Sequence, residues 1–245
     1  MNGAGNEFIE KTKYKYEEQS AQSKGLPQPP LETDYDLSRP LIALPKPDNT
    51  KYGQVSLIEV INGRRSVRQY SERCLSLDEL SYLLWCTQGV KKADSAKYTL
   101  RTVPSAGARH AFETYLLINR VEGLKPGLYR YLALEHKLLE INIQSGITEE
   151  VVAGCLGQGF AGKSAVTFIW AADVKRMKWR YEDRGYRYLH LDAGHVCQNL
   201  YLAAEAINCG VCAIAAFEDD LINSTLGLDG KEQFVIYVAA AGKKD

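Results

Sequence analysis

The segment YLHLDAGHVCQNLYLAAEAIN, residues 188–208, decides the fold. Its apolar side chains recur at positions 189, 193, 196, 200, 203, 204 and 207, which is the spacing of one helix face. Gly210 follows this run and is suited to end the helix. Ala203, Ala204 and Ala206 add a small-residue surface that lets another helix approach closely. We therefore predict a long helix at the centre of the core or at a subunit interface.

Helix and strand signals follow one another irregularly along the rest of the chain. The motif Ser76-Leu77-Asp78-Glu79 is a capping box, in which the Ser and Glu side chains satisfy free amides at a helix start. Five apolar stretches predict strands, namely Thr114–Ile118, Gly127–Ala133, Leu138–Ile143, Val166–Ala172 and Phe234–Ala240. Because strict strand–helix alternation is missing, we predict a mixed α+β sandwich and not a doubly wound parallel sheet.

The N-terminal fifth of the chain differs in composition from the rest. Six of the eight prolines lie between Pro27 and Pro47, so residues 24–50 are expected to form an extended connection, neither helix nor ordinary strand. Residues 1–23 are rich in Glu and Lys and suggest a charged helix. We predict an N-terminal arm with its extended connection over residues 1–50 and one domain over residues 51–245.

Charge and hydropathy exclude several classes of partner. Lys+Arg and Asp+Glu number 30 each, so the formal net charge is zero and gives no general attraction for nucleic acid. The longest apolar stretches are too short to cross a bilayer, and the first 23 residues lack the apolar core of a secretory signal. We expect a soluble cytoplasmic protein with neither nucleic acid nor membrane as partner. In that reducing compartment the six scattered cysteines are expected to be buried.

The most informative polar motif is Arg64-Arg65-Ser66-Val67-Arg68-Gln69-Tyr70, directly ahead of the capped helix. Arg presents a rigid fork of donors that fits phosphate oxygens, and the Ser hydroxyl adds another donor. The cluster is too short for a nucleic-acid surface and suits a single phosphate. Taken by itself, it is better explained as a solvated basic turn.

Three further stretches could face a ligand. In Pro104-Ser105-Ala106-Gly107-Ala108, small residues would let the backbone approach a flat ligand, or the stretch is a plain turn. Val211–Phe217 is similarly small and either exposes main-chain amides or forms a buried crossover. Arg180–Tyr188 is dense in Arg and Tyr, so it is either a solvated turn or places a phenol and a guanidinium over a pocket.

Three other motifs match a functional pattern as strings, but the predicted elements around them do not support that function. Gly157–Gly162 matches the dinucleotide fingerprint as a string, but a helical pattern precedes it and a strand follows, which inverts the required order. Cys209 and Cys212 have redox spacing but follow the end of a helix, so packing explains them better. His190 and His195 lie five residues apart and do not share a helix face, so no metal site is expected.

Taken together, four segments resemble the nitroreductase superfamily of FMN enzymes, and most closely its SagB/ThcOx-type branch, which includes azoline dehydrogenases. They are residues 64–70, 104–108, 180–198 and 213–217, and the resemblance covers roughly residues 52–242. It implies a three-layer α+β sandwich with a mixed, mainly antiparallel sheet flanked by helices. It also implies a long central dimer helix and a homodimer with FMN at the subunit interface.

The resemblance carries residue roles onto this chain. It implies that Arg64, Arg65, Ser66 and Arg68 hold the FMN phosphate and ribityl chain. It implies that the flavin ring lies against Pro104, Ser105, Ala106 and Gly107, and that the main chain of Ala215 and Ala216 approaches flavin N5. A basic residue near the C-terminus often completes the phosphate site, and Lys243 and Lys244 are the candidates here.

The catalytic segment departs from the azoline dehydrogenases, which carry a Lys-Tyr pair where this chain has Arg180 and Tyr181. Tyr181 keeps the phenol, whereas Arg180 cannot release a proton near neutral pH and is expected to hold an anionic group. Asp192 stands where the branch commonly has Glu. We therefore expect reduction of nitroaromatic or quinone-type molecules with NADH or NADPH. The alternatives are azoline oxidation on a peptide and a non-catalytic flavin-binding scaffold subunit in a peptide-modifying complex.

Overall fold

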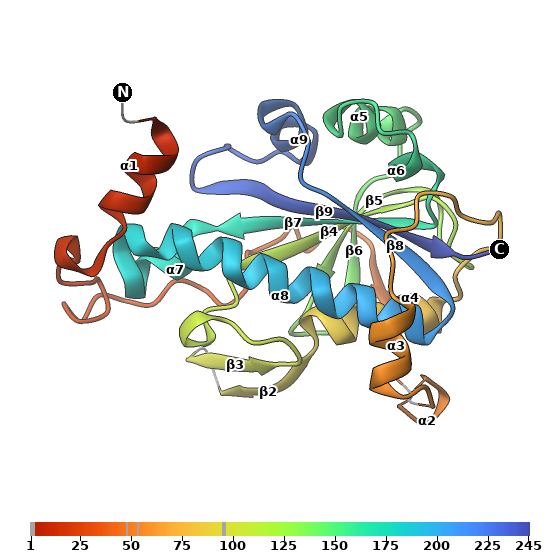
Figure 1. Cartoon of the computed structure of the whole chain (residues 1–245), viewed down its shortest axis with the longest axis horizontal. Coiled ribbons are helices and arrows are strands. Elements are labelled where there is room, and N and C mark those ends of the chain that lie inside the picture. Colours follow the sequence, from red (N-terminus) through yellow and green to blue (C-terminus); the bar gives the residue numbers. More distant parts are fainter. Residues whose placement is uncertain (1–2, 48, 53, 95–96) are drawn as a thin grey trace.

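A seven-stranded sheet runs through the middle of the molecule and carries helices on both faces (Figure 1). The computed structural model describes residues 3–47, 49–52, 54–94 and 97–245. The strand order is β1-β6-β5-β4-β7-β9-β8, and every neighbouring pair is antiparallel. The strands are β1 (Leu41–Ala43), β4 (Phe112–Ile118), β5 (Gly127–Leu132), β6 (Lys137–Asn142), β7 (Val166–Asp173), β8 (Cys209–Ile214) and β9 (Gln233–Lys243). A separate antiparallel ribbon joins β2 (Val90–Asp94) and β3 (Tyr98–Arg101).

The helices form two layers around this sheet. They are α1 (Ala4–Lys11), α2 (Asn49–Tyr52), α3 (Leu57–Gly63), α4 (Leu77–Gln88), α5 (Ile147–Gly154), α6 (Phe160–Lys163), α7 (Val174–Tyr181), α8 (Gly185–Ala206) and α9 (Asp219–Leu226). Short 3-10 turns are η1 (Tyr14–Tyr16), η2 (Ala106–Ala108) and η3 (Glu182–Arg184). One apolar core lies between the sheet and α4 and α8, and a second lies between the sheet and α5 and α9. The predicted three-layer α+β sandwich is confirmed.

Local signals located the central strands and two of the main helices correctly. The helix predicted over 188–208 is α8, which begins three residues earlier and ends two residues earlier. The capping box is present: Ser76 Oγ accepts from Glu79 N (3.2 Å), and Glu79 Oε2 accepts from Ser76 N (2.9 Å). The five predicted strands correspond to β4, β5, β6, β7 and β9. The sequence patterns therefore identify the central strands and the two helices that cover one face.

The extended connection needs one correction, because it contributes a strand. Leu41–Ala43 pairs with β6, with Leu41 opposite Leu139. This strand lies at the edge of the sheet, where only one side of the backbone must be paired, so the flanking Pro40 and Pro45 are tolerated. The proposed division of the chain at residue 50 stays a prediction. Within the described ranges, no helix is long and apolar enough to cross a membrane.

Candidate functional site

The arginine motif forms an extended loop fixed against the edge of the sheet. Val67 N donates to the Val211 carbonyl of β8 (2.9 Å), and Tyr70 Oη donates to the carbonyls of Val67 (2.8 Å) and Ala240 (3.1 Å). The loop packs so closely that a Cβ placed on Gly210 would lie 2.6 Å from Val67 Cβ. Glycine at position 210 is therefore required for this contact. The motif is therefore held by the Val67 amide and the Tyr70 hydroxyl, neither of which engages the side chains of Arg65 and Arg68.

Side chains of the motif line a groove of about 720 Å³. Arg65, Ser66 and Arg68 belong to this lining, together with Asn208 and Lys244. Arg65 and Arg68 are exposed, and neither forms an ion pair with any residue that the structure describes. Unpaired guanidinium groups beside a hydroxyl are a donor set that fits the phosphate of FMN.

The other basic side chains near this loop are differently engaged. The Arg64 guanidinium carbon lies 5.3 Å from the centre of the Tyr201 ring. Lys243 forms an ion pair with Glu79 in which both side chains are mostly buried. Lys244 lies at the groove and pairs with Glu205 at 2.7 Å. The structure thus places Lys244, and not Lys243, in the groove wall.

The segment that follows β8 is joined to the arginine motif. Tyr201 Oη accepts a hydrogen bond from Ala213 N (2.9 Å) and lies 3.0 Å from Ser66 Oγ. Ala215 and Ala216 are exposed beyond the strand, and the Ala216 carbonyl accepts from Gln158 Nε2 (2.8 Å). The two predicted cofactor segments therefore share one face of the molecule, with Tyr201 of α8 between them. Sequence reasoning missed Tyr201, because an aromatic residue on a long helix is ordinarily explained by packing.

The second predicted segment is tied to α8 by a carboxylate. Ser105 Oγ donates to Asp192 Oδ2 (2.6 Å), and Ala106 N lies 3.2 Å from each Asp192 oxygen. Asp192 is buried, which raises the pKa of its carboxyl, whereas the hydrogen bonds from Ser105 and Ala106 act to lower that pKa. Pro104 is exposed at the start of this loop. The role of Asp192 is therefore to fix the Ser105–Ala106 backbone on the long helix.

The same loop meets the predicted catalytic pair. Gly107 has a φ of +55°, and a Cβ placed there would lie 2.4 Å from Tyr181 Oη and 3.0 Å from Arg180 Nε. Arg109 Nε donates to the Gly107 carbonyl (3.0 Å) and so fixes the turn. A phenol and a guanidinium thus lie against a loop whose backbone is open to close approach. This arrangement can position an anionic or carbonyl-bearing ligand beside a proton donor.

We expect Gly107→Ala to lower the free energy of unfolding by about 1–2 kcal/mol through its left-handed φ, with a further loss from the contact with Tyr181 Oη. Gly123→Ala is the matched control, because Gly123 has a φ of +78° and a Cβ added there would have nothing within 4 Å. Urea unfolding measures the free energy of unfolding of both variants. The excess loss at Gly107 should shrink in a Tyr181→Phe background, where the contact with Arg180 at 3.0 Å remains, and an excess of undiminished size there would contradict the contact with Tyr181 Oη.

The four segments form two groups within one chain. The arginine groove includes Asn208, just beyond the C-terminal end of α8, whereas Tyr181 precedes its N-terminal end. A helix of 22 residues is about 33 Å long, so α8 separates the two groups (Figure 1). The structure therefore joins the first segment with the fourth and the second with the third, but it does not join all four in one chain.

The rejected motifs are explained by the fold. Gly157–Gly162 follows α5 and runs into the short helix α6 ahead of β7, so a helix precedes it where the fingerprint requires a strand. Cys209 and Cys212 are both buried in β8, and burial raises the pKa of the Cys209 thiol to about 12. Packing therefore accounts for this pair. Among the residues that the structure describes, no three His, Cys, Asp or Glu side chains are grouped to hold a metal ion.

Comparison with known proteins identifies the family of this chain. The model of the Nitroreductase family matches residues 61–243. The chain belongs to the nitroreductase family. Within it, a protein of Methanocaldococcus jannaschii whose name places it among the nitroreductases is 34% identical over 78% of this chain and 92% of its own length.

Two further relatives are longer than this chain. A solved structure of an Anabaena variabilis protein, also named as a nitroreductase, has a TM-score of 0.70 and 29% identity, and covers 87% of this chain and 45% of its own. The trifolitoxin-processing protein TfxB of Rhizobium leguminosarum bv. trifolii is 29% identical over 63% of this chain and 44% of its own length. This chain therefore spans less than half the length of these two proteins.

Proposed function

We propose that this nitroreductase-family protein is an FMN-dependent oxidoreductase. The observation that carries the proposal is the groove with its two unpaired arginines, Arg65 and Arg68, beside Ser66. These side chains would hold the cofactor phosphate. When bound, FMN supplies a flavin N5 that accepts or gives a hydride. Exposed main chain at Ala215 and Ala216 is available on the same face to approach the flavin ring.

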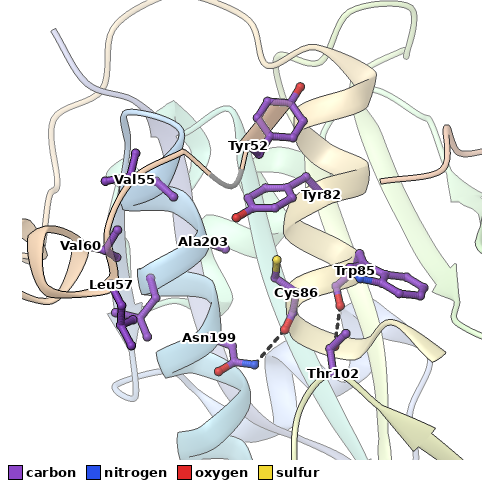
Figure 2. A pocket seen from close by; sticks show the side chains of 12 residues that line it. Tyr52, Val55, Leu57, Val60, Tyr82, Trp85, Cys86, Thr102, Asn199 and Ala203 are labelled. Atoms are coloured by element: carbon purple, nitrogen blue, oxygen red, sulfur yellow. Dashed lines mark hydrogen bonds between the residues drawn. The ribbon is translucent and has the colours of Figure 1, made fainter. Parts of the chain in front are cut away.

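We further propose a homodimer that completes this site. Since α8 separates the arginine groove from the Gly107–Tyr181 group, a two-fold partner would be needed to place its Pro104–Gly107 loop against the groove of the first chain. An apolar groove of about 500 Å³ between α3, α4 and α8 supports such pairing (Figure 2). Val55 and Leu57 line this groove, and Leu57 is 65% exposed. An apolar groove with exposed apolar side chains beside it is typical of a surface that a partner covers.

The chain's own residues suit reduction of a small acceptor. The guanidinium of Arg180 presents a fork of donors that can hold a phosphate or carboxylate, and an arginine does not serve as a general base. The Tyr181 hydroxyl, which lies at the Gly107 turn, can give a proton to a substrate held there. We therefore propose NADH or NADPH as the reductant and a nitroaromatic or quinone-type molecule as the acceptor.

The likeness to a trifolitoxin-processing protein favours a second candidate, which is azoline oxidation on a peptide. In this reading the chain would be either the dehydrogenase or a flavin-binding scaffold subunit. The Arg180 side chain weighs against the dehydrogenase, because that position would need a group that releases a proton.

The visible spectrum of the purified protein, before and after anaerobic addition of NADH or NADPH, tests the proposal. We expect flavin absorption that bleaches on reduction. Flavin absorption that persists with both reductants would favour the peptide alternative or a scaffold role. A protein that binds no flavin, even with FMN added, would contradict the proposed function altogether.

Arg68→Ala should weaken FMN binding by about 10- to 150-fold, since a hydrogen bond to a charged group contributes about 1.5–3 kcal/mol. Quenching of FMN fluorescence by the apoprotein measures the dissociation constant. Arg39→Ala is the control, because Arg39 is also exposed but donates to the Ile141 carbonyl (2.6 Å) at the far edge of the sheet. Equal affinities in both variants would remove Arg68 from the site.

A further inference from the structure

The N-terminal arm holds the end of α7, where the catalytic pair lies. Gln22 N donates to the carbonyl of Trp179 (2.8 Å), and Trp179 Nε1 donates to the carbonyl of Leu26 (2.9 Å). Trp179 immediately precedes Arg180 in the sequence. Two hydrogen bonds of opposite direction therefore fix this tryptophan between residues 22 and 26 of the arm.

The arm also supports the residue that follows the pair. Glu182 has a φ of +45° and a ψ of −139°, a conformation that L residues rarely adopt, and it ends α7 abruptly. Its Oε1 accepts a hydrogen bond from Ala21 N (3.0 Å). Such a turn persists only where its surroundings hold it, and the amide of Ala21 provides that support. Arg180 and Tyr181 thus lie between two residues that the arm fixes.

The contacts continue from the arm to the loop that meets Tyr181. The Arg109 guanidinium carbon lies 5.1 Å from the centre of the Trp179 ring, and Arg109 Nε donates to the Gly107 carbonyl. Arg109 is buried, and burial, with the nearby charge of Arg180, lowers the pKa of its guanidinium. One path of direct contacts therefore joins Leu26, Trp179, Arg109 and Gly107.

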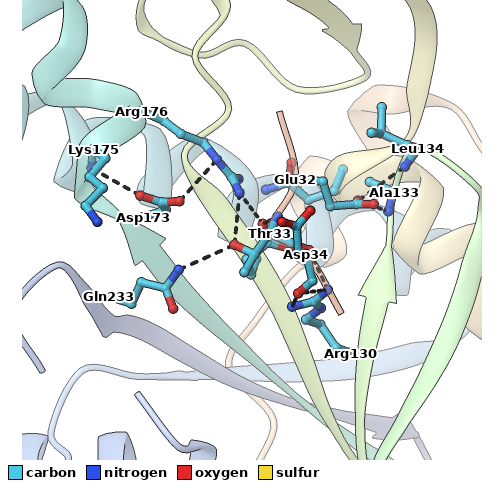
Figure 3. Close-up of polar contacts among 12 residues, drawn as sticks. Glu32, Thr33, Asp34, Arg130, Ala133, Leu134, Asp173, Lys175, Arg176 and Gln233 are labelled. Atoms are coloured by element: carbon cyan, nitrogen blue, oxygen red, sulfur yellow. Dashed lines mark hydrogen bonds and ion pairs between the residues drawn. The ribbon is translucent and has the colours of Figure 1, made fainter. Parts of the chain in front are cut away.

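The arm can act as a support because it is itself anchored downstream. Glu32 Oε1 accepts from Ala133 N (2.6 Å), Thr33 N donates to Glu113 Oε1 (2.8 Å), and Arg130 Nη2 donates to the Thr33 carbonyl (2.7 Å). Figure 3 shows Arg130 of β5 and Arg176 of α7 pointing toward residues 32–34 from the sheet and from the helix.

The arm is anchored upstream as well. Arg184 Nη1 donates to the Thr12 carbonyl, and Arg187 Nη2 donates to Thr12 Oγ1, each at 2.6 Å. Tyr14 Oη lies 2.9 Å from Tyr188 Oη. Residues 21–26 are thus held at both ends, with α7 and the start of α8 enclosed between the two anchors (Figure 1).

We propose that the N-terminal arm positions Arg180 and Tyr181 for the reaction, with Trp179 and Glu182 as the positioning residues. The proposal rests on the function proposed above. It assigns to residues 21–26 a part in turnover although they lie outside the stretch that the family model matches. Because Arg65 and Arg68 line a groove at the other end of α8, changes at Trp179 and Glu182 should affect FMN affinity much less than Arg68→Ala does.

Full-length variants at Glu182 test the proposal. Glu182→Ala removes the acceptor for Ala21 N, whereas Glu182→Gln keeps a carbonyl oxygen at the same place. Tyr35→Phe is the control, since it removes an arm hydrogen bond to Glu135 (2.6 Å) far from the pair. The first readout is hydrogen–deuterium exchange of peptides covering residues 178–183. The second is kcat and KM for NAD(P)H-driven reduction, measured at saturating FMN.

We expect exchange at residues 178–183 to rise at least fivefold and kcat to fall at least fivefold in Glu182→Ala, while FMN affinity falls much less than it does in Arg68→Ala. Glu182→Gln and Tyr35→Phe should match the wild type in all of these. Trp179→Phe, which loses the bond to Leu26, should behave as Glu182→Ala does. Tyr181→Phe should then lower kcat less in the Glu182→Ala background than in the wild type, since the phenol is already displaced.

Unchanged exchange in Glu182→Ala would overturn the proposal, and so would faster exchange with kcat unaltered. If the wild-type protein reduces no acceptor, the function proposed above fails instead. In that case the exchange of residues 178–183 alone decides whether the arm holds this segment.

Discussion

Replacing Arg176 by methionine is expected to lower the free energy of unfolding by about 3–5 kcal/mol, because it leaves a buried carboxylate without its partner. Arg176 Nη2 lies 2.5 Å from Glu113 Oε1, and their side chains are only 3% and 7% exposed (Figure 3). Burial acts to raise the pKa of Glu113, but the guanidinium groups of Arg176 and Arg130 outweigh it and hold the pKa below its usual value. The charged carboxylate therefore stabilises the fold in full above the ordinary pKa of 4.5, and this stabilisation is lost as the pH falls from there through the lower folded pKa.

Chemical denaturation measures this loss, and Lys175→Met is the matched control. Lys175 forms an ion pair with Glu232 at 2.6 Å, but both side chains are more than half exposed. Removing an exposed pair costs less than about 1 kcal/mol, so the neighbouring substitution should be nearly neutral. The double variant Arg176→Met/Glu113→Gln should recover part of the loss, since no unpaired charge is then buried. Equal losses in Arg176→Met and Lys175→Met would contradict the buried pair.

This buried charge cluster shows where sequence reasoning fails. Arg, Glu and Asp in a sequence normally predict exposed side chains, because burying a charge is costly unless it forms an ion pair or hydrogen bonds. Glu113 lies between Phe112 and Thr114 in an apolar strand, which is the one local sign of an inward carboxylate. Its partners come from α7 and from residue 33, far away in the sequence. Only the folded chain shows that the Pro-rich connection is part of this cluster.

The edge strand β8 was missed for a different reason. The run CGVCAI over residues 209–214 has few β-branched residues, so it lacks the usual strand pattern. The small residue at position 210 is required by packing, since a side chain on Gly210 would clash with Val67 of the arginine loop. The sequence left two interpretations of Val211–Phe217 open, ligand-facing amides or a buried crossover. Each describes one half of the segment, because the first half is a buried strand and the second half, from Ala215, is exposed.

The site was predictable as a set of segments but not as an arrangement. The arginine motif, the Pro104–Ala108 turn and the Arg180–Tyr181 pair were each identified by residue type and by their shared resemblance to one family. Their separation along α8 depends on helix length and packing, and the position of Lys244 depends on where β9 ends. These properties belong to the tertiary structure, and no motif in the sequence encodes them.

Acidification is expected to destabilise the protein through His110, at the end of the loop that carries Gly107. Burial, with the charge of Arg101 next in importance, lowers the pKa of His110 from 6.5 to about 3. His110 is 5% exposed, and its Nδ1 has no hydrogen-bond partner in the described part of the chain. The neutral ring is thus the folded form, whereas the unfolded chain takes up a proton below pH 6.5.

Because the folded pKa of His110 lies below the unfolded one, this stability is fully present above pH 6.5 and is lost as the pH falls toward 3. The expected loss is about 1.4 kcal/mol for each pH unit below 6.5. Urea unfolding between pH 7.5 and 5, above the range of ordinary carboxyl groups, measures the slope. His110→Asn, which tolerates the local φ of +43°, should be less stable at pH 7.5 but should lose much less on acidification.

We expect acidification to destabilise the Ser105–His110 loop before it unfolds the rest of the protein. His110 N donates to Ser105 Oγ (2.9 Å), the same hydroxyl that donates to Asp192 and so fixes the loop on α8. A proton on His110 would place a third positive charge beside Arg101 and Arg109, and movement of the ring would release Ser105. Amide exchange in residues 105–110 should therefore rise below pH 6 in the wild type, and in His110→Asn it should not depend on pH in this range. A wild-type slope that persists in His110→Asn would assign the acid sensitivity to another group.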